Sequence, residues 1–236
     1  MSASSGESAE DVAGRIVLVV DAATAPGVQE ACAELAATLA DRAGMPVTVA
    51  TVPSDCLDAV RPALGRAENA RIRELRPAGR APVPMSAAPF VWRDDGRPDW
   101  GGMWESFCEL ALYGGPPHRG PDNPLRASAS MGADAAWDPD MVAEMQRGIW
   151  ETARLYAEPG QPGWLAVTCD SRTMAAWLCA AIILENVDAR VEEDRLLLPV
   201  GPGYRLQDEV KSIITVTAKT HHYWRAHITG AAGGSD

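Results

Sequence analysis

Residues 170–186, DSRTMAAWLCAAIILEN, constrain the fold more than any other stretch of the chain. Read as a helix, the stretch is apolar on nearly all sides of its axis, so it should be buried on more than one side. Its longest apolar run, TMAAWLCAAIIL, is too short to cross a bilayer. We therefore expect a globular protein with no membrane contact, built around this helix.

The elements on either side of this helix predict a C-terminal lobe over residues 139–228. Asp138 followed by Pro139 predicts a helix start, with a capping carboxylate and a proline at the first helical position. Residues 164–169 predict a strand, residues 187–200 a hairpin that turns at 193–194, and residues 205–224 a closing helix. The first helix should present one apolar face: Met141, Met145, Ile149, Thr152 and Tyr156. The predicted order is a ferredoxin-like αβαββα lobe.

The N-terminal part, residues 14–76, has the pattern of a βαβ unit. RIVLVV, at 15–20, is a continuous apolar run typical of a strand that is covered on both faces. MPVTVATV, at 45–52, predicts a second strand, and the helix between them should present Val28, Cys32, Leu35 and Leu39 on one stripe. Strands joined by a helix are usually parallel.

Residues 77–138 form a Pro- and Trp-rich insert between the two lobes. Ten of the eighteen prolines lie between Pro77 and Pro139, and only 103–113 predict a helix. A long irregular segment in a compact domain is usually functional or disordered, and the aromatic residues of this one argue against disorder. The overall prediction is an α/β protein of two β/α lobes joined by this insert, with disordered tails at 1–13 and 229–236.

Charge and cysteine content limit the classes of function and the cellular location that the sequence allows. A net charge of -11 argues against nucleic-acid binding, which needs a basic surface. Five cysteines without a C-x-x-C predict reduced thiols, and the polar, acidic start is not that of a signal peptide. We expect a cytoplasmic protein, and the Ala-, Arg- and Gly-rich usage indicates a bacterial one.

Familiar cofactor and catalytic motifs are missing from the sequence. It contains no G-x-G-x-x-G, no Walker A pattern, no H-E-x-x-H and no G-x-S-x-G. No pair of His and Cys residues has a common metal-ligand spacing, so we predict no metal site. The sequence indicates neither a known family nor a particular cofactor.

The segment PPHRG, residues 116–120, is the strongest candidate site. Its prolines fix two φ angles and its glycine permits a tight turn, so the loop is stiff. Histidine titrates near neutral pH, and arginine grips carboxylate or phosphate. We expect an anion site with His118 as acid–base and with Arg119 and Arg126 as clamps, near Asn123. The alternative is a rigid surface loop whose His and Arg pair with acidic neighbours.

Two other segments add candidates to this site. His221 shares a helical stripe with Leu206, Val210, Ile213 and Trp224. It is either a satisfied core histidine or a residue that reaches the same cavity as His118 and orients it. Asp170 follows a predicted strand, where α/β proteins often bind ligands. Its alternative is a helix cap, with Cys169 as a small buried hydrophobe. Trp104 and Tyr113 should wall the pocket.

These residues predict an enzyme or binding protein for a small anionic molecule, with a biosynthetic role. Two alternatives stay open. One is a non-catalytic accessory subunit that docks a protein partner, or a second copy of itself, through the aromatic insert. The other is a metal-handling protein that uses His and Cys side chains. A closed pocket at His118 would favour the first function, and a flat exposed aromatic patch would favour docking.

Overall fold

The computed structural model describes residues 16–21, 26–43, 47–60, 89–105, 117–120, 123–127 and 138–233. Their main elements, in chain order, are β1 (Ile16–Asp21), α1 (Pro26–Ala43), β2 (Val47–Val52), η1 (Ser54–Cys56), α5 (Pro139–Ala153), β3 (Tyr156–Pro159), β4 (Trp164–Thr168), α6 (Arg172–Ile183), β5 (Arg190–Glu192), β6 (Arg195–Pro199), the π-helical turn η4 (Leu206–Val210) and α7 (Lys211–Gly233). No helix of these residues is long and apolar enough to cross a membrane.

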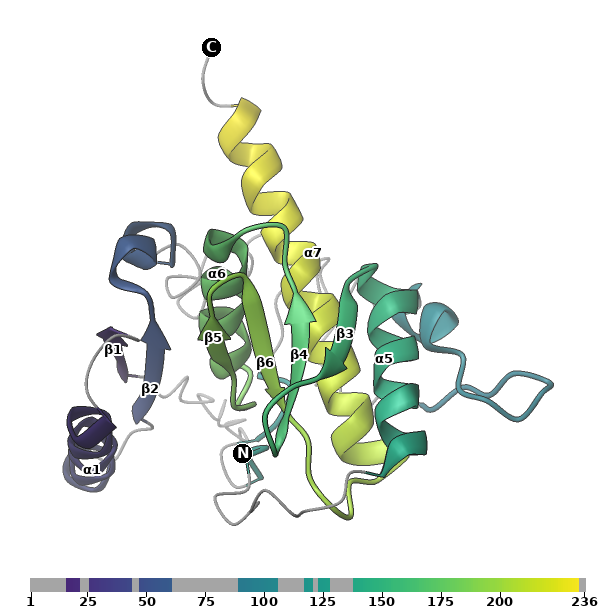
Figure 1. The fold of residues 1–236 in the computed structure, drawn as a ribbon, viewed down its shortest axis with the longest axis horizontal. Coiled ribbons are helices and arrows are strands. Elements are labelled where there is room, and N and C mark those ends of the chain that lie inside the picture. Colours follow the sequence, from purple (N-terminus) through teal and green to yellow (C-terminus); the bar gives the residue numbers. More distant parts are fainter. Residues whose placement is uncertain are drawn as a thin grey trace, which may run out of the picture.

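A four-stranded antiparallel sheet in the order β3-β4-β6-β5 forms one layer of the fold (Figure 1). Helices α5, α6 and α7 form the other layer, with α7 in contact with both α5 and α6. The hairpin of β5 and β6 confirms the prediction for residues 187–200, and its turn lies at Glu193, whose φ is 53°. The chain is therefore a mixed α/β protein.

Strand β3 corrects the predicted C-terminal lobe. Helix α5 ends at Ala153 because Arg154 adopts a left-handed conformation with a φ of 59°. Tyr156, which was expected on the helix, instead lies on β3 opposite Thr168, with 61% of its surface exposed. The observed order is αββαββα, so the ferredoxin-like αβαββα prediction was wrong by one strand. YAEP lacks the alternation that marks a strand, and only its pairing with β4 makes it one.

Helix α6 confirms the prediction that it is buried on several sides. All ten residues from Met174 to Ile183 are buried, and the helix contacts α7, β2, β5 and β6. Its N-cap is Ser171, whose hydroxyl accepts a hydrogen bond from the Met174 amide at 3.1 Å. The cap predicted for α5 is also present, because the Asp138 carboxylate accepts from the amides of Asp140 and Met141.

The N-terminal strands pair in parallel, and β2 packs against α6 and β5. The buried residues Ala50, Val52 and Cys56 belong to the same hydrophobic cluster as α6. At the other end of the chain, α7 continues to Gly233 and so includes residues 229–233, which were expected to form a tail. The four described cysteines, Cys32, Cys56, Cys169 and Cys179, are free.

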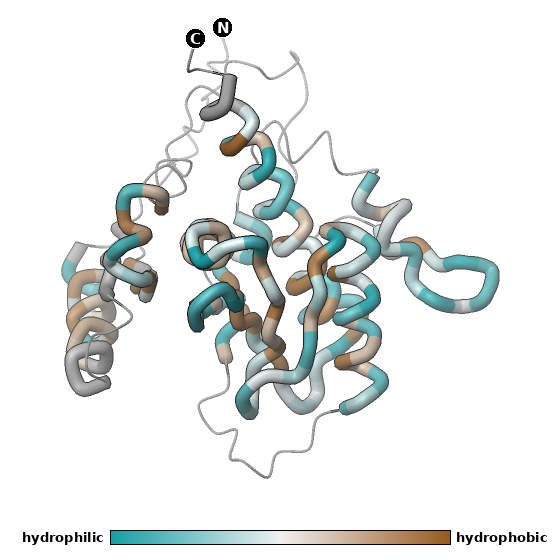
Figure 2. Tube along the Cα trace, turned by 45° about the horizontal axis from the view of Figure 1, so that its top comes forward, coloured by the Kyte–Doolittle hydropathy of each residue, from teal (hydrophilic) through white to brown (hydrophobic). Residues whose placement is uncertain are grey.

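Residues 89–105 of the insert are fastened to α5. Arg93 donates to Glu151 at 2.8 Å, and the buried Trp100 indole donates to Glu144 at 2.7 Å. Residues 100–105 are helical, and the rest of the helix predicted at 103–113 lies outside the described residues. The loop that protrudes beside α5 is mostly hydrophilic (Figure 2). Because Trp100 is buried and its indole is bonded to Glu144, this aromatic residue holds residues 89–105 to the core.

Gly148 allows α5 and α7 to approach closely, and we expect Gly148→Ala to lower the free energy of unfolding by about 1–3 kcal/mol. A Cβ at this position would lie 2.2 Å from Cδ1 and 2.8 Å from Cγ1 of the buried Ile214. Urea unfolding of the variant measures the loss. Gly101→Ala is the control, because a Cβ there meets nothing closer than 4.0 Å and alanine favours a helix. Equal stability of the two variants would contradict the prediction.

Candidate functional site

The loop around His118 is fixed to the C-terminal end of α6. The His118 amide donates to the Glu185 carboxylate at 2.7 Å, and the Arg119 amide donates to the Glu185 carbonyl at 3.2 Å. The Asn186 side chain donates to the Arg119 carbonyl at 2.6 Å. Further on, the Leu125 amide donates to the Asn186 carbonyl at 2.9 Å. The backbone of the loop is thus held as though it were an additional strand beside residues 185–188.

The Arg119 side chain anchors this loop to η4 and α7. It is 5% exposed, and its guanidinium donates to the Asn123 carbonyl at 2.7 Å, to Asp208 at 2.8 Å and to the Ser212 hydroxyl at 2.9 Å. Burial works against ionisation of Asp208, but hydrogen bonding to Arg119 and the Arg119 charge lower its pKa overall. Most of the N–H groups of the Arg119 guanidinium therefore donate to groups of the protein itself. We assign it a positioning role.

The His118 imidazole lies in the interior of the protein. It is 1% exposed, and neither Nδ1 nor Nε2 has a hydrogen-bond partner among the residues that the structure describes. Burial lowers the pKa of His118 to about 3, with the charge of Lys219 as the next cause. Arg119 and Lys211 lower this pKa further, and Asp208 opposes them. The imidazole is neutral at pH 7, with one N–H donor and one acceptor available.

Two buried lysines of α7 lie near this imidazole. Lys219 is 3% exposed, and its Nζ lies 2.7 and 2.8 Å from the two carboxylate oxygens of Glu185. Lys211 is also buried, and burial lowers its pKa while Asp208 opposes that effect. We call the five side chains of His118, Arg119, Glu185, Lys211 and Lys219 the His118 cluster. It brings three cations and one carboxylate around a neutral histidine.

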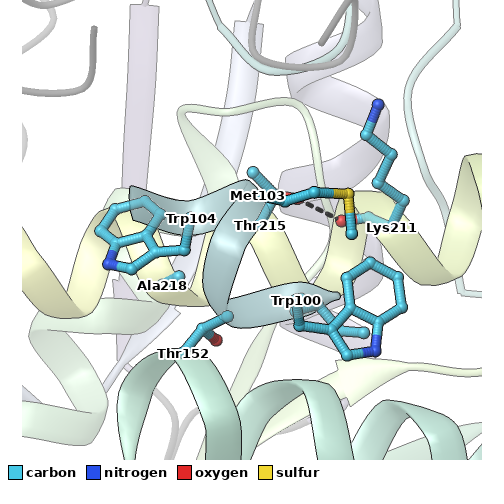
Figure 3. A pocket seen from close by; sticks show the side chains of 8 residues that line it. Trp100, Met103, Trp104, Thr152, Lys211, Thr215 and Ala218 are labelled. Atoms are coloured by element: carbon cyan, nitrogen blue, oxygen red, sulfur yellow. Dashed lines mark hydrogen bonds between the residues drawn. The ribbon is translucent and has the colours of Figure 1, made fainter. Parts of the chain in front are cut away.

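A small hollow adjoins the cluster between the helical residues 100–105, α5 and α7 (Figure 3). The hollow has room for about one water molecule. Trp104, which was predicted to wall a pocket at His118, lies on this hollow, whose lining does not include His118. Its ring contacts the His222 ring with centroids 6.0 Å apart. The hollow is lined by Trp100, Met103, Trp104, Thr152, Lys211, Ile214, Thr215 and Ala218.

No contact among the described residues joins His221 to His118. The two residues Lys219 and His221 are two positions apart on α7, which places their side chains about 200° apart around the helix. Burial is the main cause that lowers the pKa of His221, and the charges that act on it are those of Arg225, Asp170 and His222. None of these belongs to the His118 cluster. His221 is half-buried on another face of α7, with different neighbours.

The remaining predicted site residues lie nearer the surface. Arg126 pairs with Asp188 at 2.7 Å and is largely exposed, and Asn123 contributes only its carbonyl to Arg119. Asp170 is exposed beyond β4, where Ser171 takes the capping role. Tyr113 lies outside the described residues. Burial raises the pKa of Cys169 to about 12, so this thiol is a buried hydrophobe.

Sequence reasoning did not single out Lys211, Lys219 or Glu185. A signal was present, because Lys219 interrupts the apolar and Thr-rich run of residues 213–220 and Lys211 lies two residues before that run. Lysine is almost never fully buried unless it is paired. Their positions on α7, eight residues apart, also place them about 80° from each other around the helix axis. Glu185 directly follows the apolar run of α6, where a carboxylate can meet such a lysine.

Comparisons with protein-family models, curated proteins and solved structures give no match. Within the described ranges, no group of three or more His, Cys, Asp or Glu side chains is arranged to hold a metal ion. The interpretation of the site therefore depends on the geometry of the His118 cluster.

Proposed function

We propose that this protein binds a small anionic metabolite at the His118 cluster, either as a binding protein or as an enzyme in which His118 acts as acid–base. The observation that carries the proposal is the buried His118 imidazole, which has cations around it and no hydrogen-bond partner among the described residues. A buried polar group without a partner costs about 1–3 kcal/mol, so it calls for a water, an ion or a ligand.

The charges of the cluster favour an anion as that ligand. Lys219, Arg119 and Lys211 each act on His118 so as to disfavour its positive charge. A bound carboxylate or phosphate would accept the imidazole N–H and offset these charges. The fixed loop backbone adds to this, because a site whose groups are already held in place loses little entropy on binding.

The same electrostatics give His118 a chemical role that depends on the ligand. Without an anion, the imidazole is neutral at pH 7 and can only accept a proton. An anion close to it favours the protonated form, which can then donate a proton to that ligand. Arg126 lies on the surface beside Asp188, so we reserve the direct contacts for His118 and the lysines.

Thermal unfolding in the presence of acetate or inorganic phosphate tests the proposal. A ligand at about 100 times its dissociation constant should stabilise the wild-type protein by about 2.7 kcal/mol. His118→Asn should lose most of this stabilisation, while the control His221→Asn, on another face of α7, should keep it. Equal stabilisation of the His118→Asn variant and the wild-type protein would exclude the site.

A second candidate function is docking of a protein partner through exposed aromatic residues. Trp92 on the insert is 48% exposed, and Trp150 on α5 is 51% exposed. Arg93, next to Trp92, is joined to Glu151, next to Trp150, so the two indoles belong to neighbouring segments. Trp92→Ala should leave anion binding unchanged and weaken any partner or self-association measured by analytical ultracentrifugation.

We include a bacterial cytoplasmic location and a biosynthetic context in the proposal. The four described cysteines are free, and three of them are buried. Free thiols are usual in a reducing compartment, which is the support for this location.

A further inference from the structure

The hollow beside Lys211 has an apolar surface although several of its residues carry polar groups. The hydroxyls of Thr152 and Thr215 each donate to a backbone carbonyl of their own helix, at 2.8 and 2.6 Å. The indole N–H of Trp100 donates to Glu144 at 2.7 Å. Because these donors are already used, the walls offer a ligand mainly aromatic rings, methyl groups and the Met103 thioether.

Lys211 joins this hollow to the His118 cluster. It is one of the lining residues, and its side chain extends past Met103, away from Thr152 on the opposite side of the hollow (Figure 3). Its charge also acts on His118. On α7 the hollow is lined by the stripe of residues 211, 214, 215 and 218. Lys219 of the cluster and Ser212, which accepts from Arg119, lie roughly 80–100° further around the axis from Lys211. The two regions are therefore neighbours along one helix.

We propose that the ligand of the His118 cluster is amphiphilic, with an anionic head at the cluster and a single-ring apolar body in the hollow. This inference rests on the proposed function and specifies its substrate class. Ligand pockets commonly combine an apolar lining with a few polar groups that fix orientation, and the two regions together have that composition. An aromatic carboxylate is the simplest molecule with this distribution of charge.

Met103 controls whether such a ring can enter the hollow. In the structure the hollow has room for about one water, so a ring has to displace a side chain. Methionine has three rotatable bonds and adapts readily to new neighbours. Trp100 cannot move as easily, because it is buried and bonded to Glu144. We therefore expect Met103 to move aside while the two tryptophans form the walls.

The test compares benzoate with its two halves, acetate for the head and benzyl alcohol for the body, by isothermal titration calorimetry. The wild-type protein should bind benzoate at least about tenfold tighter than either half, which corresponds to about 1.4 kcal/mol. Ala218→Leu, which fills the hollow, should reduce benzoate affinity to the level of acetate and leave acetate unchanged. The control Ala226→Leu lies on the exposed side of α7 and should change neither.

A second variant covers the case in which Ala218→Leu does not fold. Met103→Ala widens the hollow, and it should increase the affinity for 1-naphthoate at least about fivefold relative to benzoate. No such gain in a folded Met103→Ala protein would overturn the inference.

The outcomes separate this inference from the proposed function. Equal binding of benzoate and acetate, both abolished by His118→Asn, overturns the amphiphilic ligand and retains the anion site. Benzyl alcohol that binds as tightly as benzoate, and independently of His118, also overturns the amphiphilic ligand, because the hollow is then a separate apolar site. Benzoate and acetate that bind without any effect of His118→Asn overturn the proposed function itself.

Discussion

Replacing Glu185 by alanine is expected to lower the free energy of unfolding by about 3–5 kcal/mol, the cost of leaving a buried charge without its partner. Both carboxylate oxygens of Glu185 lie within 2.8 Å of Lys219 Nζ, and Lys219 is 3% exposed. The carboxylate also accepts the His118 amide, so the variant loses the attachment of the loop as well. Urea unfolding measures the change.

Two comparisons make this result specific. Glu192→Ala removes an exposed carboxylate on β5 and should change stability by no more than about 0.5 kcal/mol. Lys219→Met in the Glu185→Ala background should recover part of the loss, because the unpaired ammonium is then gone. A double variant that shows the simple sum of the two single losses would mean that Glu185 and Lys219 are not coupled.

Acidification is expected to destabilise the ligand-free protein through His118. The folded pKa of about 3 lies below the ordinary value of 6.5, so between these values the unfolded chain binds a proton that the folded protein does not. Stability is therefore fully present above pH 6.5 and falls by up to about 1.4 kcal/mol per pH unit as the pH drops towards 3. Between about pH 7 and pH 4.5 this residue accounts for a loss of roughly 2–3 kcal/mol.

The His118→Asn variant isolates this contribution. Asparagine is polar but does not titrate in this range, so the variant should lose about 2–3 kcal/mol less than the wild-type protein between the two pH values. Urea unfolding at each pH gives the difference. A wild-type protein and a variant that lose the same stability would show that His118 is not held neutral in the folded state.

Local patterns in the sequence were sufficient for several elements. The nearly all-round apolarity of residues 170–186 predicted a helix buried on several sides, and Asp138 with Pro139 predicted the start of α5. The turn of the β5–β6 hairpin was found at the expected residues. Such features depend on neighbouring residues in the chain, so a local pattern records them. Strand β3 has no such local pattern, because its four residues become a strand only through pairing with β4.

By itself, the sequence determined that the stiff loop presents His118 and Arg119 together. The tertiary structure decided what each residue does there. The partners of Arg119 lie 89 and 93 positions away, and they make it an anchor for the loop. Glu185 lies 67 positions from His118, and together with the buried lysines of α7 it surrounds an imidazole that sequence reasoning placed beside His221. Contacts between residues so far apart in the sequence depend on how the layers pack, and the periodicity within one segment does not predict them.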